Sequence, residues 1–218
     1  MRNDVATGMQ RSAWFTGFTV GGLLLLAVGA GAAQLQARDA RQLEHGDRTR
    51  TYVVRRPANL PRDAKLPVII VLHGGGGNAA NAERMSGLTP FAHARGVMVV
   101  YPNGTAAGNA STLTWNAGRC CAYAMRNNVD DVGFLSKMID QLVEKEGADP
   151  KRIYVTGMSN GGMMSHRVAV EAGEKLAGAA PIAGALNSPL QKGPPVPIIM
   201  IHGTADVHVL LAGGHPTR

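Results

Sequence analysis

The chain has 218 residues, of which 45% are apolar, 17% are charged and 28 are glycine. This composition excludes an intrinsically disordered chain, and the length suits one domain with a hydrophobic core better than two. Of the net charge of +7, residues 1–62 carry +5, with nine arginines and no lysine against four acidic residues. The remaining residues show no basic stripe interleaved with aromatic side chains, so we expect no nucleic-acid partner.

The first 33 residues predict an export signal. Arg2 and Arg11 precede an uncharged stretch whose apolar centre at 23–28 is followed by small residues up to Ala33. A positive region, an apolar region and an A-x-A cleavage site follow in the order of a signal peptide. An uncleaved anchor is the alternative, because about 20 weakly polar residues can span a bilayer. In both cases we expect a secreted or periplasmic protein whose only membrane contact would be this anchor.

Residues 34–50 are interpreted as an Arg-rich linker, and the domain is expected over 51–218. Runs of branched apolar residues predict strands buried on both faces of a parallel sheet, and apolar residues spaced by three and four predict helices between them. The expected strands lie at 51–56, 68–72, 97–101, 153–156, 177–182 and 196–201. The expected helices lie at 80–94, with an interruption near Gly87 and Pro90, and at 131–147 and 160–172. This alternation predicts an α/β fold with a mostly parallel sheet.

A glycine-x-serine-x-glycine motif occupies residues 157–161, directly between an expected strand and an expected helix. This is the position of a nucleophile elbow, a sharp turn that exposes a serine at the carboxyl edge of a sheet. Glycine at 157 and 161 removes side chains that would obstruct the turn. We therefore expect Ser159 to be a catalytic nucleophile. The structural alternative is a glycine-rich turn without chemistry.

A serine nucleophile also needs N–H groups directed at the oxyanion that forms during the reaction. The backbone amide of Asn160 supplies one by its position after the nucleophile. The loop His73–Gly77, with four consecutive glycines after a buried strand, is placed to supply the other from Gly75. A phosphate-binding turn is the alternative, but neither a G-K-[ST] sequel nor a G-x-G-x-x-G register is present. His73 itself is expected to be a structural hydrogen-bonding group rather than a base.

An orienting carboxylate should follow the nucleophile at the end of a later strand. The run at 196–206 offers a strand, a tight turn and Asp206, which is the candidate acid. The alternative is an aspartate that only caps backbone amides in its turn.

Cys120 and Cys121 are the only cysteines of the chain. Adjacent Cα atoms are about 3.8 Å apart, whereas a disulfide usually joins Cα atoms about 5.5 Å apart. Each cysteine is therefore expected either to have its partner elsewhere or to remain a buried free thiol. Two ligands alone are not expected to bind a metal.

Six motifs in this order resemble the secreted serine esterase family that includes polyhydroxybutyrate depolymerase-like and feruloyl-esterase-like enzymes. The resemblance covers residues from about 50 to 208, and its motifs are LHGGGG at 72–77, YPNG at 101–104, WNAGRCC at 115–121, VDDVGFL at 129–135, RIYVTGMSNGGMM at 152–164 and HGTAD at 202–206. It implies an α/β-hydrolase fold, Ser159 as nucleophile, Asp206 as triad acid, and hydrolysis of carboxylic esters without a metal or an organic cofactor. Trp115 and its loop resemble the segment that lines the substrate cleft.

One feature departs from that family, in which the triad histidine lies well downstream of the acid. Here His208 and His215 follow Asp206, and the chain ends twelve residues after it. We therefore expect a hydrolase domain that lacks its last strand or strands and helix. Whether this chain is itself active is left open at this point. A catalytically silent exported binding protein is the alternative. The ester could be a polyhydroxyalkanoate, a ferulate, an acetate or a related compound.

Overall fold

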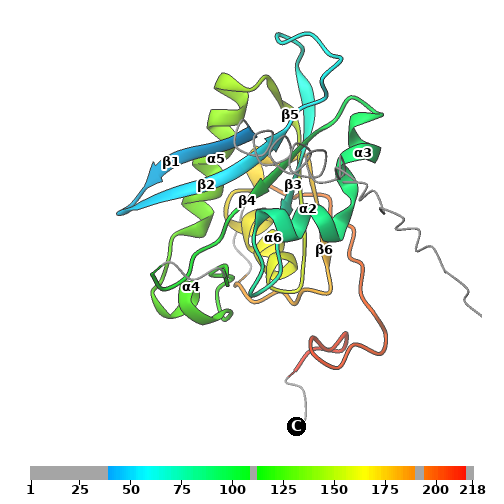
Figure 1. The fold of residues 1–218 in the computed structure, drawn as a ribbon. Coiled ribbons are helices and arrows are strands. Elements are labelled where there is room, and N and C mark those ends of the chain that lie inside the picture. The colour runs from blue at the N-terminus through cyan, green and yellow to red at the C-terminus, as the bar shows by residue number, and fades with distance from the viewer. Residues whose placement is uncertain (1–38, 109–111, 190–193, 215–218) are drawn as a thin grey trace, which may run out of the picture. The chain divides into compact units, whose positions relative to one another are not determined.

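The computed structural model describes residues 39–108, 112–189 and 194–214. The expected export signal and His215 lie outside these residues. The described part forms a six-stranded sheet in the order β1-β2-β4-β3-β5-β6 (Figure 1), in which the pairs β4-β3, β3-β5 and β5-β6 are parallel and the pairs β1-β2 and β2-β4 antiparallel. The strands are β1 (Ala40–His45), β2 (Arg48–Arg55), β3 (Leu66–Leu72), β4 (Met98–Pro102), β5 (Ala148–Met158) and β6 (Gly178–Ile182).

Helices cover both faces of the sheet, as the alternating sequence pattern predicts (Figure 1). One hydrophobic cluster joins α5 and α6 to one face, and a second joins α2 and α3 to the other. Strand β4 is buried along its whole length because Met98 and Val100 belong to the first cluster, whereas Val99 and Tyr101 belong to the second. The helices are α2 (Ala79–Ser86), α3 (Leu88–His93), α4 (Ala122–Arg126), α5 (Asp131–Lys145), α6 (Asn160–Glu171) and the 3-10 turn η1 (Gly173–Lys175).

The expected linker is partly wrong, because residues 40–50 belong to an antiparallel hairpin of β1 and β2. This hairpin joins the sheet through the pairing of β2 with β4. The arginine-rich sequence concealed it, since Arg50 points into the core and is neutralised there by Asp131, 2.7 Å away. The domain therefore begins at Asp39 rather than at residue 51.

Two expected elements are irregular. The helical stretch expected at 80–94 is divided at Gly87, as the sequence predicts, because Gly87 has a φ of 56° and ends α2 before α3 begins. The strand expected at 196–201 lies along β6 but forms only the isolated parallel bridges Ala179↔Ile198 and Ile182↔Ile201. Pro197 has no N–H to donate, which explains part of the interruption.

The faces of β5 and β6 that do not contact α6 are open in the described part of the chain. Tyr154 is 39% exposed and Ile199 70%, beside an apolar hollow of about 470 Å³, and Met158 is 41% exposed. Parallel strands are usually covered on both faces, whereas these are covered on one.

Among the described residues no helix is long and apolar enough to cross a membrane.

Candidate active site

Ser159 occupies the turn between β5 and α6. Its backbone has φ 56° and ψ −120°, outside the range that a non-glycine residue ordinarily adopts. Two backbone hydrogen bonds hold it there, from the Ser159 N–H to the Ile182 carbonyl at 2.9 Å and from the Met163 N–H to the Ser159 carbonyl at 2.8 Å. Such a conformation costs on the order of 1–3 kcal/mol and persists where surrounding contacts impose it. The turn thus has the backbone expected of a nucleophile elbow.

The two glycines of the motif are required by close packing against the end of β3. A Cβ on Gly157 would lie 2.7 Å from the carbonyl oxygen of Leu72. A Cβ on Gly161 would overlap that same oxygen and would lie 2.6 Å from the carbonyl oxygen of His73. The elbow therefore sits directly against the strand that leads into the glycine-rich loop.

That loop brings the second expected oxyanion donor beside Ser159. A Cβ built on Gly74 would lie 3.9 Å from the Ser159 Cβ, and one on Gly75 would lie 3.6 Å from the Asn160 Cβ. Within the described residues, neither the Gly75 N–H nor the Asn160 N–H has a hydrogen-bond acceptor. Asn160 also begins the twelve-residue helix α6, whose N-terminus carries partial positive charge. Both amides are thus available to an anion near Ser159.

His73 is a structural group, as expected. Its side chain is 1% exposed; Nδ1 bonds the Gly74 carbonyl at 2.7 Å, and Nε2 accepts the Gly104 N–H at 2.9 Å. Burial lowers the pKa of His73 to about 4, although the bond to the Gly74 carbonyl opposes the shift. The imidazole is therefore neutral at pH 7 and has no free nitrogen with which to act as a base.

Trp115 packs behind the elbow and bonds to His73 and Asn160. The structure buries its side chain completely, so we reassign it from the wall of the cleft to this support. Its indole Nε1–H donates to the His73 carbonyl at 3.0 Å, and its ring lies 4.9 Å from the imidazole. Its backbone N–H and carbonyl bond the Asn160 carboxamide at 2.8 and 3.0 Å. The sequence pattern missed these contacts because they join residues far apart in the chain.

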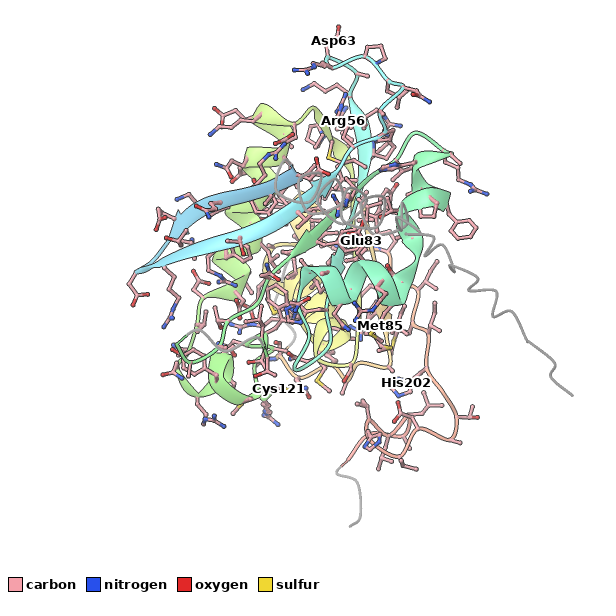
Figure 2. All side chains as sticks on the ribbon, viewed as in Figure 1. Arg56, Asp63, Glu83, Met85, Cys121 and His202 are labelled. Atoms are coloured by element: carbon pink, nitrogen blue, oxygen red, sulfur yellow. A yellow bond between two sulfur atoms is a disulfide. The ribbon has the colours of Figure 1, made fainter. Side chains whose placement is uncertain are left out.

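Asp206 lies in a turn with His208 and Val209, whose N–H groups its carboxylate accepts. One carboxylate oxygen accepts the N–H groups of Val209 and His208 at 2.9 and 2.8 Å, and these bonds hold the pKa of Asp206 below its ordinary value. The other oxygen is 3.5 Å from Nε2 of His202, which itself bonds the Val209 carbonyl at 2.6 Å. Figure 2 shows His202 on the segment that leaves the sheet after β6. The structure therefore shows the turn-capping contacts of Asp206 and no contact with Ser159.

A general base is not brought to Ser159 in the part of the chain that the structure describes. The Ser159 hydroxyl makes no hydrogen bond with any of the described histidines. His166, on α6, is buried with Nε2 unpartnered, and burial lowers its pKa. Across the same described ranges, no cluster of three His, Cys, Asp or Glu side chains could hold a metal.

The two cysteines differ from expectation. The structure joins Cys120 to Cys121 by a disulfide across a cis peptide bond, with Cα atoms 3.1 Å apart. The expectation of partners elsewhere rested on the longer separation of trans neighbours. Cys121 lies at the start of α4 (Figure 2), and the Cys120 sulfur is 3.9 Å from the Asn160 carboxamide nitrogen.

A buried ion pair anchors the segment that carries Trp115. Arg50 and Asp131 are 2.7 Å apart with side chains 2% and 0% exposed. The second oxygen of Asp131 accepts the Asn116 N–H at 2.7 Å, and the guanidinium lies 3.9 Å from the centre of the Phe134 ring. The pair thus ties β2, α5 and the residue after Trp115 together.

A profile of the dienelactone hydrolase family matches residues 52–214. The chain belongs to this family. Its fold is that of the α/β hydrolases, as the sheet, the elbow and the resemblance in sequence all predict.

Known proteins similar to this member of the dienelactone hydrolase family include esterases. A protein named as an esterase, NocK of Nocardia uniformis subsp. tsuyamanensis, is 36% identical over 171 residues, which are 77% of this chain and 48% of that protein. Feruloyl esterase B of Piromyces equi is 33% identical over 171 residues, 76% of this chain and 31% of that protein. The crystal structure of a thermostable esterase superimposes with a TM-score of 0.59 at 23% identity and covers 82% of this chain and 50% of that one. The chain spans about half or less of the length of these proteins.

Proposed function

We propose that this protein is a carboxylic ester hydrolase that acts through Ser159 and a covalent acyl-enzyme. The backbone of Ser159 carries the proposal: it is held at φ 56° between β5 and α6, beside two available amides. A serine in this position projects from the carboxyl edge of the sheet, where a substrate carbonyl can reach it. The names of NocK and of feruloyl esterase B support an ester as the substrate.

In the proposed reaction the Ser159 oxygen attacks the ester carbonyl carbon while its proton passes to an imidazole. The carbonyl oxygen becomes an oxyanion that accepts the N–H groups of Gly75 and Asn160. The bond between the acyl carbon and the leaving oxygen then breaks. The imidazole returns the proton to that oxygen, and the alcohol leaves. Water repeats the attack on the acyl-enzyme and releases the carboxylic acid and free Ser159. Every step transfers an acyl group or a proton, so none requires a redox cofactor.

We assign Asp206 as the carboxylate that orients the imidazole. Met158, Ile182 and Ile201 share one level of the sheet register, so the turn after Ile201 starts at the same edge as Ser159. Two strand spacings, about 10 Å, separate Ile201 from Met158, so the segment that carries Asp206 starts beside the elbow. His215 is the candidate for this imidazole from the sequence, and His215→Ala tests it by its turnover rate.

The test is covalent labelling by a fluorophosphonate together with hydrolysis of p-nitrophenyl acetate. We expect the label on the peptide that contains Ser159, with no label and background hydrolysis for Ser159→Ala. The control is Ser136→Ala on α5, which removes a serine hydroxyl outside the elbow and should label as the wild type does. Labelling of another serine, or unchanged turnover in Ser159→Ala, would refute the proposal. A panel of a 3-hydroxybutyrate oligomer, methyl ferulate and an acetate ester will identify the acyl group.

We further propose that the protein acts outside the cytosol. The apolar segment and the A-x-A site within residues 1–33 support this location. N-terminal sequencing of the protein from its native host should find a chain that begins near Ala33. An intact Met1 in a membrane fraction would instead identify an uncleaved anchor.

A further inference from the structure

The Asn160 side chain makes a pair of hydrogen bonds that the catalytic scheme does not use. Its oxygen accepts the Trp115 backbone N–H at 2.8 Å, and its nitrogen donates to the Trp115 carbonyl at 3.0 Å. The residue is 2% exposed, so water does not compete for these groups. The carboxamide therefore bonds both backbone polar groups of Trp115, as a paired β-strand residue does, and both its oxygen and its nitrogen are held.

Trp115 continues this connection toward the glycine-rich loop. Its indole N–H donates to the His73 carbonyl at 3.0 Å, one residue before Gly74. The His73 ring lies 4.9 Å from the indole ring, tilted by 34°, and its Nε2 accepts the Gly104 N–H at 2.9 Å. The two amides assigned to the oxyanion, which are 85 residues apart in sequence, are thus connected through the single residue Trp115.

We propose that the Asn160 carboxamide is a positioning residue, which holds the Asn160 backbone N–H and, through Trp115, the Gly75 loop in the geometry that binds the oxyanion. This inference rests on the proposed esterase function and adds a role for a side chain that would not touch the substrate. The backbone amide and the carboxamide share one Cα, so fixing both carboxamide ends restricts rotation of the amide.

The required accuracy is high, because an oxyanion donor works at 2.7–3.1 Å and catalytic groups must be held within about 0.5 Å. Removal of one complete donor lowers the rate on the order of 10²- to 10³-fold. A donor that is present but free to rotate should cost less, about 10- to 100-fold in the chemical step. Binding of the substrate before the reaction should change little, since the carboxamide faces Trp115 rather than the surface.

The test follows labelling of Ser159 in the full chain by a fluorophosphonate as a function of its concentration. The serine oxygen bonds to phosphorus, fluoride leaves with the hydroxyl proton as hydrogen fluoride, and the phosphoryl oxygen occupies the oxyanion position. The maximal labelling rate reports the chemical step, and the half-saturating concentration reports binding. The variants are Asn160→Ala, Asn160→Asp and Trp115→Phe. The control is Tyr52→Phe, which removes a 2.8 Å bond to Gln141 away from the site.

We expect Asn160→Ala and Trp115→Phe to lower the maximal rate at least tenfold with an unchanged half-saturating concentration. Tyr52→Phe should stay within twofold of the wild type. Asn160→Asp should be slow at pH 8 and recover relative to the wild type as the pH falls, because a protonated carboxyl has the donor and the acceptor that Trp115 requires. If Asn160→Ala does not fold, Asn160→Asp and Trp115→Phe decide the question, since aspartate keeps the shape of the Asn160 side chain and phenylalanine keeps an aromatic ring while it removes the indole N–H.

Wild-type rates in folded Asn160 variants would overturn the inference and leave the proposed function intact. The inference would also be overturned if Tyr52→Phe lost as much of the maximal labelling rate as the Asn160 variants and these losses followed the urea unfolding midpoints. Such losses would reflect a general decrease in stability. Absence of label on Ser159 in the wild type would refute the proposed function itself, and the inference with it.

Discussion

Acidification should destabilise this fold through His73. The imidazole is buried beneath the glycine-rich loop, with both ring nitrogens bonded to backbone groups. Protonation would place a cation in the core and would remove the lone pair that accepts the Gly104 N–H. Burial therefore lowers the pKa of His73 to about 4 from its ordinary 6.5.

The size and sign of the effect follow from these two pKa values. Between pH 6.5 and 4 the unfolded chain binds a proton at this site that the folded chain does not, so the free energy of unfolding falls as the pH falls. The stabilisation is complete above pH 6.5 and is lost near pH 4. A shift of ~2.5 units corresponds to ~3 kcal/mol, a large part of the 5–15 kcal/mol that is typical of a domain.

The assay is urea unfolding of the wild type and of His73→Gln at several pH values from 7.5 to 4. Glutamine can still accept the Gly104 N–H but does not titrate. The variant should be less stable at pH 7.5, and the difference in unfolding free energy should shrink by ~3 kcal/mol at pH 4. Other titrating groups, including His166 and Asp206, contribute equally to both proteins and cancel. Parallel stability curves for the two proteins would refute the reasoning, because they would mean that His73 titrates alike in the folded and unfolded chains.

Three further substitutions test the elbow and the buried ion pair. Ser159→Gly should raise the free energy of unfolding by ~1 kcal/mol in urea titrations, because glycine accepts the positive φ without strain; a loss of stability would contradict the strained backbone. Arg50→Met should lower it by ~3–5 kcal/mol at pH 7, since Asp131 would keep a buried charge without its partner, and the loss should diminish as the pH falls, because burial raises the pKa of Asp131. Gly161→Ala should cost ~3 kcal/mol or more by calorimetry, because its Cβ would overlap the Leu72 carbonyl; a neutral effect would show that the elbow can move away from β3.

Features that depend on neighbouring residues could be predicted from the sequence. The apolar run at 68–72 lies within β3, and the intervals of three and four after Asp131 lie within α5. The motif at 157–161 predicted both the elbow and the reason for its glycines, because a turn between a strand and a helix has few permitted backbones. The sequence by itself therefore predicted the fold class, the strands β2 to β6 in their order and the position of Ser159, but not β1.

Contacts between distant residues were decided only by the tertiary structure. Arg50 looked like part of a solvated linker until Asp131, 81 residues away, neutralised it in the core. Trp115 looked like a cleft residue until its burial and its bonds to His73 and Asn160 showed it to be a support. Residue type does not reveal whether a charge or an indole faces water or the core, because the free energy of burial depends on the partner that satisfies it. Local sequence determined where the turn that carries Ser159 forms, and long-range pairing decided what holds it.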